Sequence, residues 1–325
     1  MIHILVCLDG SNLAKKVLPY ALAIARNFDS RITLLHVLEH QHVDPCKPID
    51  PVAWEMQKRE AVNHLKAVEA STTGVSITSV VIEGKPAEQI NDWINKNAVD
   101  LTVLCSHGEH GPSQWPIAST TQKLITSNSG AIFLVPAACL EQDVKRDINY
   151  KRLLVPLDST SWADSALSFA INIANNPQSE IILAQHLPKP GLIQIGSLDA
   201  EANLLENQIV QYNKRIAEKN LEKTKFWLQS STSAEIKHLI VTSHGVGREV
   251  ANFIESEGVD LVVMSANGTF DRSEKFFGKV TPKLLIHSQV PVVLLSGRAL
   301  EGKGRVRLDH RLLDPLARFP SRASL

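Results

Sequence analysis

Short runs of hydrophobic residues alternate along the chain with longer segments in which hydrophobic positions recur every three or four residues. The first run covers residues 2–8, and the helical spacing that follows it gives residues 14–25 one apolar face. Continuous apolar runs of this length are typical of parallel strands buried on both faces, and the wider spacing is typical of half-buried helices. The alternation predicts an α/β fold in which helices cover both faces of an open parallel sheet.

The same reading extends along the whole chain. The expected strands cover residues 2–8, 32–37, 75–82, 101–105, 131–136, 152–157, 180–186, 236–242, 260–264 and 291–295. One helix is expected after residue 11 and another begins near Pro86. The other expected helices cover residues 52–71, 119–128, 162–175, 199–230, 247–257 and 279–288. Pro19 lies inside the first of these helices, so we expect a bend there or a first turn that is not fully helical.

The chain repeats itself with a period of about 150 residues, which is too long for a solenoid repeat and fits two domains of ordinary size. Residues 4–11 (ILVCLDGS) return as residues 153–160 (LLVPLDST). Residues 100–108 (DLTVLCSHG) return as residues 260–268 (DLVVMSANG). We expect two tandem Rossmann-like domains, each with an open five-stranded parallel sheet. Their expected limits are residues 1–137 and 151–297, with a linker at 138–150 and a basic C-terminal tail at 298–325.

Charge and hydropathy limit the setting in which the protein works. Lys and Arg number 34, as do Asp and Glu, so no net charge draws the chain to nucleic acid. No apolar run reaches the roughly 20 residues that span a bilayer, and the N-terminus enters a strand without a secretory signal. We therefore expect a cytoplasmic protein with no membrane insertion and no nucleic-acid partner.

Cysteine and tail chemistry add two further expectations. The four cysteines, Cys7, Cys46, Cys105 and Cys139, lack the spacing of a zinc site, so no metal site is expected. Buried, reduced thiols are the expectation for Cys7 and Cys105, and a redox switch is the alternative. From Arg298 onward, six arginines and one lysine face three acidic residues, interspersed with leucines. This tail is either a segment that docks on a protein partner or a solvated end without a role.

Candidate binding residues follow from the fold class, because open α/β sheets bind ligands beyond the carboxyl ends of their strands, where strand order reverses. Asp9 and Asp158 end the first strand of each repeat, and Val37 and Leu187 follow the second. In the second repeat, Gly268 is separated by nine residues from Gly278, which opens an expected helix. Glycine backbone and unpaired amides in the first turn of a helix together form a phosphate cradle.

These segments resemble the tandem type of the universal stress protein family over residues 1 to about 297. The resemblance is carried by residues 4–11, by Leu35-His36-Val37, by residues 84–88 (GKPAE) and by residues 105–108 (CSHG). It implies an adenine-nucleotide site, with ATP as the ligand in the members that bind it. Those members carry a glycine, two residues, a second glycine, nine residues, and then a glycine followed by Ser or Thr.

Neither repeat keeps that loop motif intact. The first repeat places Cys105, Gly108, Ala118 and Ser119 at its four positions, and the second places Ser265, Gly268, Gly278 and Lys279 there. Ala118 adds a Cβ where backbone should approach phosphate. Lys279 puts a cation at a helix N-terminus, which costs roughly 0.3–1 kcal/mol unless an anion binds beside it. The alternative for Lys279 is that it reaches Glu274 or points into water.

The resemblance also places Asp9, with Gly10 beside it, and Asp158 near the adenosine part of the nucleotide. The alternative is that these aspartates only form turns and cap the helices that follow. His107 lies in the loop motif but Asn267 replaces it in the second repeat. This change disfavours a general base, so we interpret His107 as structural or hydrogen-bonding. His36 and His186 are interpreted as packing or surface residues.

The sequence favours a regulator that works by binding, because it shows no nucleophile–base pair and no catalytic metal spacing. No catalytic residue is expected. The leading hypothesis is a cytoplasmic stress-response protein that senses ATP or another adenine nucleotide. One alternative is a slow ATPase that uses Gly268, Gly278 and Lys279. The other is a nucleotide-independent interaction module whose tail engages a partner such as a membrane transporter. The resemblance also implies an internal pseudo-dimer paired through residues 132–135 and 292–295, and a homodimer is a further option.

Overall fold

The computed structural model describes residues 2–11, 16–39, 50–107, 119–127, 130–141, 148–157, 163–174, 176–188, 200–243, 246–265, 285 and 288–295. The chain divides into two compact units. The first comprises the first repeat as far as Asn149 together with the last strand of the second repeat, and the second unit runs from Tyr150 to Val290.

The first unit is built on a parallel sheet in the order β3-β2-β1-β4-β5. Its strands are β1 (Ile2–Cys7), β2 (Ser30–Leu38), β3 (Ser76–Glu83), β4 (Leu101–Cys105) and β5 (Ala131–Val135). Three successive residues of β1, Ile4, Leu5 and Val6, are all fully buried. Successive side chains of a strand point to opposite faces, so β1 is covered on both. This confirms the α/β fold that the apolar runs predict.

The helices of the first unit are α2 (Leu18–Ala25), α3 (Pro51–Ser71), α4 (Pro86–Asn97), α5 (Ser119–Ser127) and α6 (Ala137–Glu141). Proline occupies the first turn of α2, α3 and α4, where its missing N–H costs no hydrogen bond. Pro19 therefore marks the start of a helix and not a bend within one. The Asp50 carboxylate caps α3 by accepting from the amides of Val52 and Ala53. The short helix α6 lies where the sequence predicts only a linker.

The strand β10 (Val292–Leu295) pairs antiparallel with β5 in the first unit. Val292, Val293 and Leu294 lie opposite Leu134, Phe133 and Ile132, and all six are buried. This pairing satisfies an edge whose open amides and carbonyls would otherwise invite aggregation. It confirms the expected pairing of residues 132–135 with 292–295, while an internal pseudo-dimer remains a prediction.

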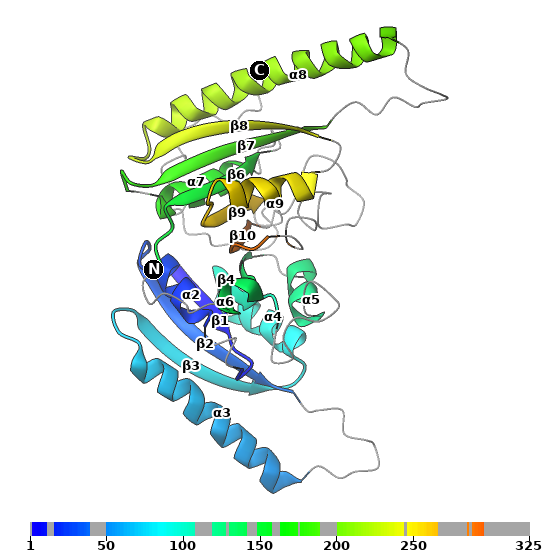
Figure 1. The fold of residues 1–325 in the computed structure, drawn as a ribbon. Coiled ribbons are helices and arrows are strands. Elements are labelled where there is room, and N and C mark those ends of the chain that lie inside the picture. Colours follow the sequence, from blue (N-terminus) through cyan, green and yellow to red (C-terminus); the bar gives the residue numbers. More distant parts are fainter. Residues whose placement is uncertain are drawn as a thin grey trace. The chain divides into compact units, whose positions relative to one another are not determined.

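The second unit carries the parallel strand order β9-β6-β7-β8. Its strands are β6 (Arg152–Leu157), β7 (Glu180–Pro188), β8 (Glu235–Ser243) and β9 (Leu261–Ser265), and its helices are α7 (Ala163–Ile173), α8 (Ala200–Gln229) and α9 (Val246–Ser256). Figure 1 shows α8 running along β8, and it packs against both β7 and β8. The helix expected at residues 279–288 falls almost wholly outside the described residues.

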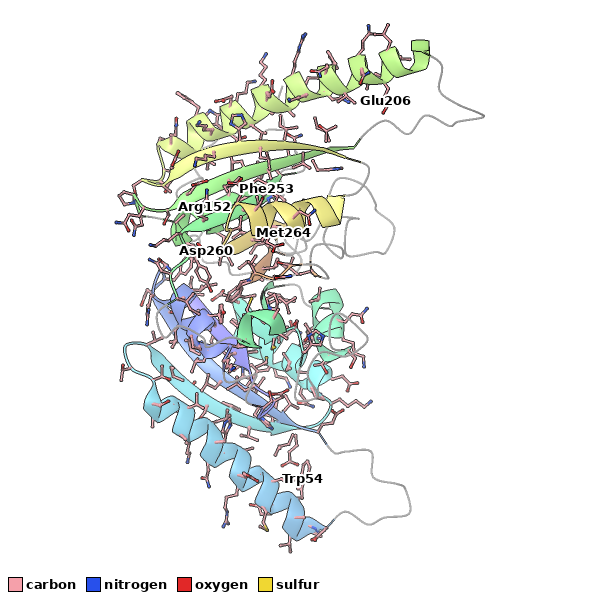
Figure 2. All side chains as sticks on the ribbon, viewed as in Figure 1. Trp54, Arg152, Glu206, Phe253, Asp260 and Met264 are labelled. Carbon is pink, nitrogen blue, oxygen red and sulfur yellow. The ribbon has the colours of Figure 1, made fainter. Side chains whose placement is uncertain are left out.

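A buried aspartate at the start of β4 explains one of the repeated sequence segments. The Asp100 carboxylate accepts a hydrogen bond of 2.9 Å from the His3 amide, and the Asp100 amide donates to the His3 carbonyl at 2.9 Å. In the second repeat, Asp260 accepts from the amides of Lys151 and Arg152, both at 2.9 Å. Figure 2 shows Asp260 and Arg152 lying close together. Both aspartates lie at the amino ends of the strands, away from the edge where ligands bind.

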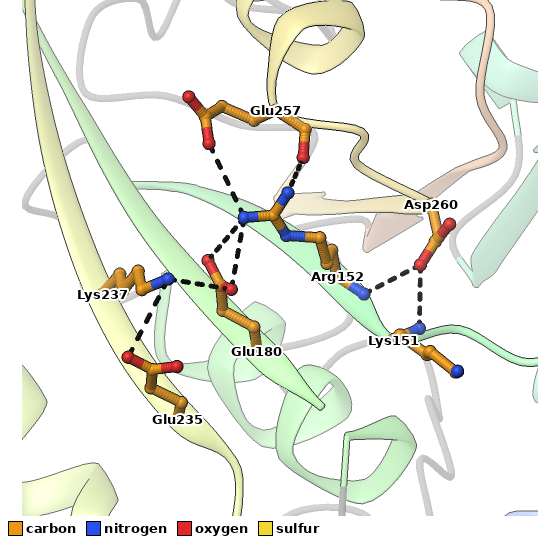
Figure 3. Close-up of polar contacts among 7 residues, drawn as sticks. All are labelled: Lys151, Arg152, Glu180, Glu235, Lys237, Glu257 and Asp260. Carbon is orange, nitrogen blue, oxygen red and sulfur yellow. Dashed lines mark hydrogen bonds and ion pairs between the residues drawn. The ribbon is translucent and has the colours of Figure 1, made fainter. Parts of the chain in front are cut away.

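The Arg152 side chain joins three elements of the second unit (Figure 3). Its guanidinium pairs with Glu180 on β7 at 3.3 Å and with Glu257, just after α9, at 3.6 Å, and it also donates to the Glu257 carbonyl. Lys237 on β8 reaches the same Glu180 carboxylate at 3.1 Å. Glu180 is only 12% exposed and holds two cations, so the ion pairs form a network that joins the amino ends of β6, β7 and β8.

Replacing Asp100 with alanine should lower the free energy of unfolding by roughly 1–3 kcal/mol, because the buried His3 amide loses its acceptor. Denaturant unfolding of the full chain measures this change. The control is Asp92→Ala, which removes an exposed pair with Lys96 at 3.9 Å and should cost at most about 0.5 kcal/mol. Equal effects of the two variants would contradict the role given to Asp100.

Candidate functional site

The strand order places a candidate site at the carboxyl ends of β1 and β4. The chain leaves β1 for β2 on one side and later returns to place β4 on the other. Connections on opposite sides of the sheet leave a crevice between the two strand ends, which is where open α/β sheets bind ligands. The turn after β1, the end of β4 and the start of α5 supply the described residues around this point.

The turn after β1 carries Asp9 and Gly10. The exposed Asp9 carboxylate accepts a hydrogen bond from the Ser11 amide at 3.0 Å. Asp9 therefore stabilises the turn, as the alternative of a turn-forming aspartate predicts. Gly10 has a φ of +84°, a conformation that is natural only for glycine. A Cβ on Gly10 would lie 3.3 Å from Cε1 of His36. The backbone therefore runs tightly over the end of β2.

Val37 follows His36 in β2, is half-buried and pairs with Ile82 of β3. His36 contacts the Gly10 position, so the Asp9–Gly10 turn lies over β2 one residue before Val37. Successive side chains of a strand point to opposite faces, so this contact involves His36 and not the Val37 side chain. That Asp9, Gly10 and Val37 bind one ligand stays a prediction.

The residue after β4 is bonded to the neighbouring strand β5 and to the start of α6. The Ser106 amide donates to the Val135 carbonyl at 2.9 Å, and the Ser106 hydroxyl accepts from the Ala137 amide at 2.8 Å. His107 is buried and its Nδ1 lies 2.9 Å from the same hydroxyl. This contact agrees with a hydrogen-bonding role for His107.

Ser119 begins α5 and is exposed. Two residues later, the Thr121 hydroxyl donates to the Cys105 carbonyl at 3.0 Å. This bond fixes the first turn of α5 beside the end of β4. The free amides of a first helical turn and the helix dipole favour an anion at that position.

His36 is a buried residue beside the candidate site, in keeping with its interpretation as a packing residue. His36 is only 9% exposed, and its Nδ1 has no hydrogen-bond partner within the described part of the chain. Burial lowers the pKa of His36, the nearby Asp9 charge opposes that shift, and His64 adds to it. The sequence offered two signals: His36 is a polar residue within an apolar strand, and it lies in the segment Leu35-His36-Val37 that carries the family resemblance.

The other candidate residues are less well placed. Leu187 is half-buried in β7, where it pairs with Thr242. Seven residues lie outside the described residues, so their arrangement stays a prediction: Gly108, Ala118, Asp158, Gly268, Gly278 and Lys279, with Cys46 among the cysteines. The candidate site in the second repeat therefore rests only on its sequence.

The three described cysteines, Cys7, Cys105 and Cys139, are half-buried free thiols. Burial raises the pKa of Cys7 to about 12, that of Cys105 to about 11 and that of Cys139 to about 12. These thiols are therefore protonated at neutral pH, which opposes the redox alternative because the thiolate is the reactive form. Among the residues that the structure describes, no cluster of His, Cys, Asp and Glu could hold a metal ion. In the same residues, no helix is long and apolar enough to cross a membrane.

Comparisons with known proteins identify the family to which this chain belongs. The sequence profile described as "Universal stress protein family" matches residues 1–135 and again 149–296. The chain therefore belongs to the universal stress protein family and carries two copies of its domain in tandem.

Relatives match one repeat or both. Universal stress protein MJ0531 of Methanocaldococcus jannaschii is 27% identical over 134 residues, covering 39% of this chain and 77% of that protein. Universal stress protein MJ0577 of the same organism is 24% identical over 158 residues, covering 46% and 96%. A solved universal stress protein from Archaeoglobus fulgidus has a TM-score of 0.61 at 16% identity, and the match covers 90% of this chain and 98% of that one. That likeness shows a shared fold.

Acidification should destabilise the protein in part through His36. Its pKa is lowered by burial, so below about pH 6.5 the unfolded chain binds a proton that the folded chain resists. His36 therefore contributes stability that is present above pH 6.5 and lost as pH falls below it. Denaturant midpoints at about pH 7.5 and about pH 5.5 measure the loss, which should be smaller in His36→Gln. An equal loss in both proteins would show that His36 is not the group that titrates.

Proposed function

We propose that this protein is a cytoplasmic stress-response regulator that works by binding an adenine nucleotide at the carboxyl edge of the first unit. The observation that supports the proposal is that the Asp9–Gly10 turn, which contacts His36 of β2, and the first turn of α5, which is bonded to the end of β4, both lie at the carboxyl edge where strand order reverses. Family membership supports the same ligand class. The nucleotide acts as an input that changes what the protein binds, and no chemical step is assigned to it.

The two ends of the proposed site suit the two ends of a nucleotide. For the nucleoside, Gly10 offers backbone without a side chain and Val37 offers a half-buried apolar side chain, and the Asp9 carboxylate can accept from hydroxyl or amino groups. Ser119 and the first amides of α5 offer hydrogen-bond donors for phosphate. Cys105, where the family motif has glycine, brings a half-buried side chain to the strand end and limits how closely phosphate approaches.

The second repeat is the other place where nucleotide could bind. It keeps Gly268 and Gly278 but has Lys279 where the motif has a hydroxyl residue. Lys279 would attract phosphate as a point charge. The two repeats have therefore lost different parts of one motif, and the proposal assigns binding to the first repeat because its described residues converge.

Isothermal titration of the full chain with ATP, ADP and AMP tests the proposal. Ser119→Glu should weaken ATP binding about tenfold or more, because it places a carboxylate where phosphate would lie. The same change suits a helix N-terminus and should not unfold α5. AMP, with fewer phosphates, should lose less affinity than ATP in this variant.

Lys279→Glu is the matched change in the second repeat and should leave ATP binding intact. Loss of binding in Lys279→Glu but not in Ser119→Glu would move the nucleotide site to the second repeat. No binding of any nucleotide by the unaltered chain would overturn the proposal in favour of a nucleotide-independent interaction module. Steady phosphate release from ATP, measured in the same samples, would favour the slow ATPase instead.

A further inference from the structure

Large hydrophobic side chains exposed to solvent gather on two equivalent helices. Within the described residues, every such side chain lies on α3 or α8, the long helices that follow the second strand of each repeat. On α3 they are only Val52 and Met56, whereas on α8 they are Leu204, Leu205, Ile209, Tyr212, Ile216, Phe226 and Trp227. Clustered exposed apolar surface of this kind marks an interaction site.

Four of these residues form a stripe on the N-terminal half of α8, which we call the α8 stripe: Leu205, Ile209, Tyr212 and Ile216. Their exposed fractions are 51%, 36%, 66% and 44%. Spacings of four, three and four residues place them on one side of the helix, as in the seam of a coiled coil. The buried side of α8 lies elsewhere, at Ala217, Leu221 and Leu228.

The α8 stripe begins in a part of the helix that has no counterpart in the first repeat. α8 has 30 residues against 21 in α3, a difference of about 14 Å at 1.5 Å per residue. Figure 1 shows the N-terminal end of α8 extending past the end of β8. The extra residues include Leu205, the first residue of the stripe, so packing on the sheet does not account for its position.

We propose that the α8 stripe binds the same stripe of a second copy of this chain, with the two α8 helices antiparallel. This inference is independent of the nucleotide proposal. The proposed contact lies on a helix and is distinct from the pairing of β5 with β10.

The spacing of the stripe fits two-fold symmetry. A two-fold interface must be complementary to itself, because the same patch is used by both subunits. The order four, three, four reads the same in both directions, so an antiparallel copy sets Leu205 against Ile216 and Ile209 against Tyr212. The axis then passes between Val210 and Gln211, and each apolar residue of the stripe faces an apolar residue.

Charge selects the antiparallel orientation. Lys219 and Lys223 are exposed and continue the stripe toward the C-terminal end of α8. A parallel pair would stack each of these lysines on its own copy, which costs stability. In the antiparallel pair, the two lysines of one copy lie at the opposite end of the contact from those of the other.

The size of the stripe sets the strength of the dimer. Four exposed side chains over three helical turns bury less area than the roughly 1,200–2,000 Å² of a standard interface. The dimer should therefore be of the weak, reversible kind and should form as the protein concentration rises through the micromolar range.

Sedimentation velocity of the full chain from about 2 to about 200 μM should show a reversible monomer–dimer equilibrium. Tyr212→Glu should weaken the equilibrium at least about tenfold, because it puts like charges at the centre of the contact. Phe226→Glu is the matched control: it makes the same change on the same helix at a residue 73% exposed, outside the overlap. It should leave self-association unchanged, and both variants should keep the thermal unfolding midpoint of the unaltered chain.

Cysteine crosslinking tests the orientation. Leu205→Cys and Ile216→Cys proteins, mixed and mildly oxidised, should form a disulfide between the two variants, identified by peptide mass. A Leu205→Cys protein that crosslinks chiefly to itself would show a parallel pair and overturn the proposed arrangement. A chain that stays monomeric at every concentration, or that dimerises equally well as Tyr212→Glu, would overturn the α8 stripe as the dimer surface.

Discussion

The position of β1 between β2 and β4 is the constraint on which the rest of the first unit depends. β1 pairs with β2 over six residues and with β4 over three, and its three central side chains are fully buried. The Asp100 contacts with His3 hold its amino end, opposite the candidate site. With that end fixed, the chain emerges from the other end as the Asp9–Gly10 turn. The geometry of the candidate site therefore depends on how β1 is held in the sheet.

Comparison of the two repeats distinguishes residues that the fold requires from residues that a binding site requires. The aspartate that begins β4 and β9 is kept in both repeats, and in both it accepts backbone amides from the first strand. Residues at the carboxyl edge have diverged, since Gly10 corresponds to Ser159 and His107 to Asn267. A strand junction can be held together in only a few ways, because buried amides require acceptors. A loop at the ligand edge is free to change in one copy while the other keeps its function.

Much of the fold was predictable because strands and the starts of helices both have local causes in the sequence. Apolar runs located each described strand, and prolines located the first turns of α2, α3 and α4. The helix α6 was missed because its five residues are too few to show a period. In the site, Asp9, Gly10, Val37 and Ser119 followed from strand order and the family resemblance. The position of His36 beneath Gly10 did not, because that contact joins two strands and depends on backbone geometry that no sequence pattern encodes.

The distinction between binding and catalysis can be argued from the same residues. Catalysis at the carboxyl edge would need a group that gives up or accepts a proton near neutral pH and touches the ligand. The described thiols are held protonated by burial, and the His107 ring is engaged with the Ser106 hydroxyl. Asp9 is committed in part to its own turn through the Ser11 amide. The His36 ring lies buried beneath Gly10, and burial lowers its pKa. Glycine backbone, the first amides of α5 and a serine hydroxyl are the groups by which the proposed site would recognise a ligand. They suit the proposed response to a nucleotide, which is a change in what the protein binds.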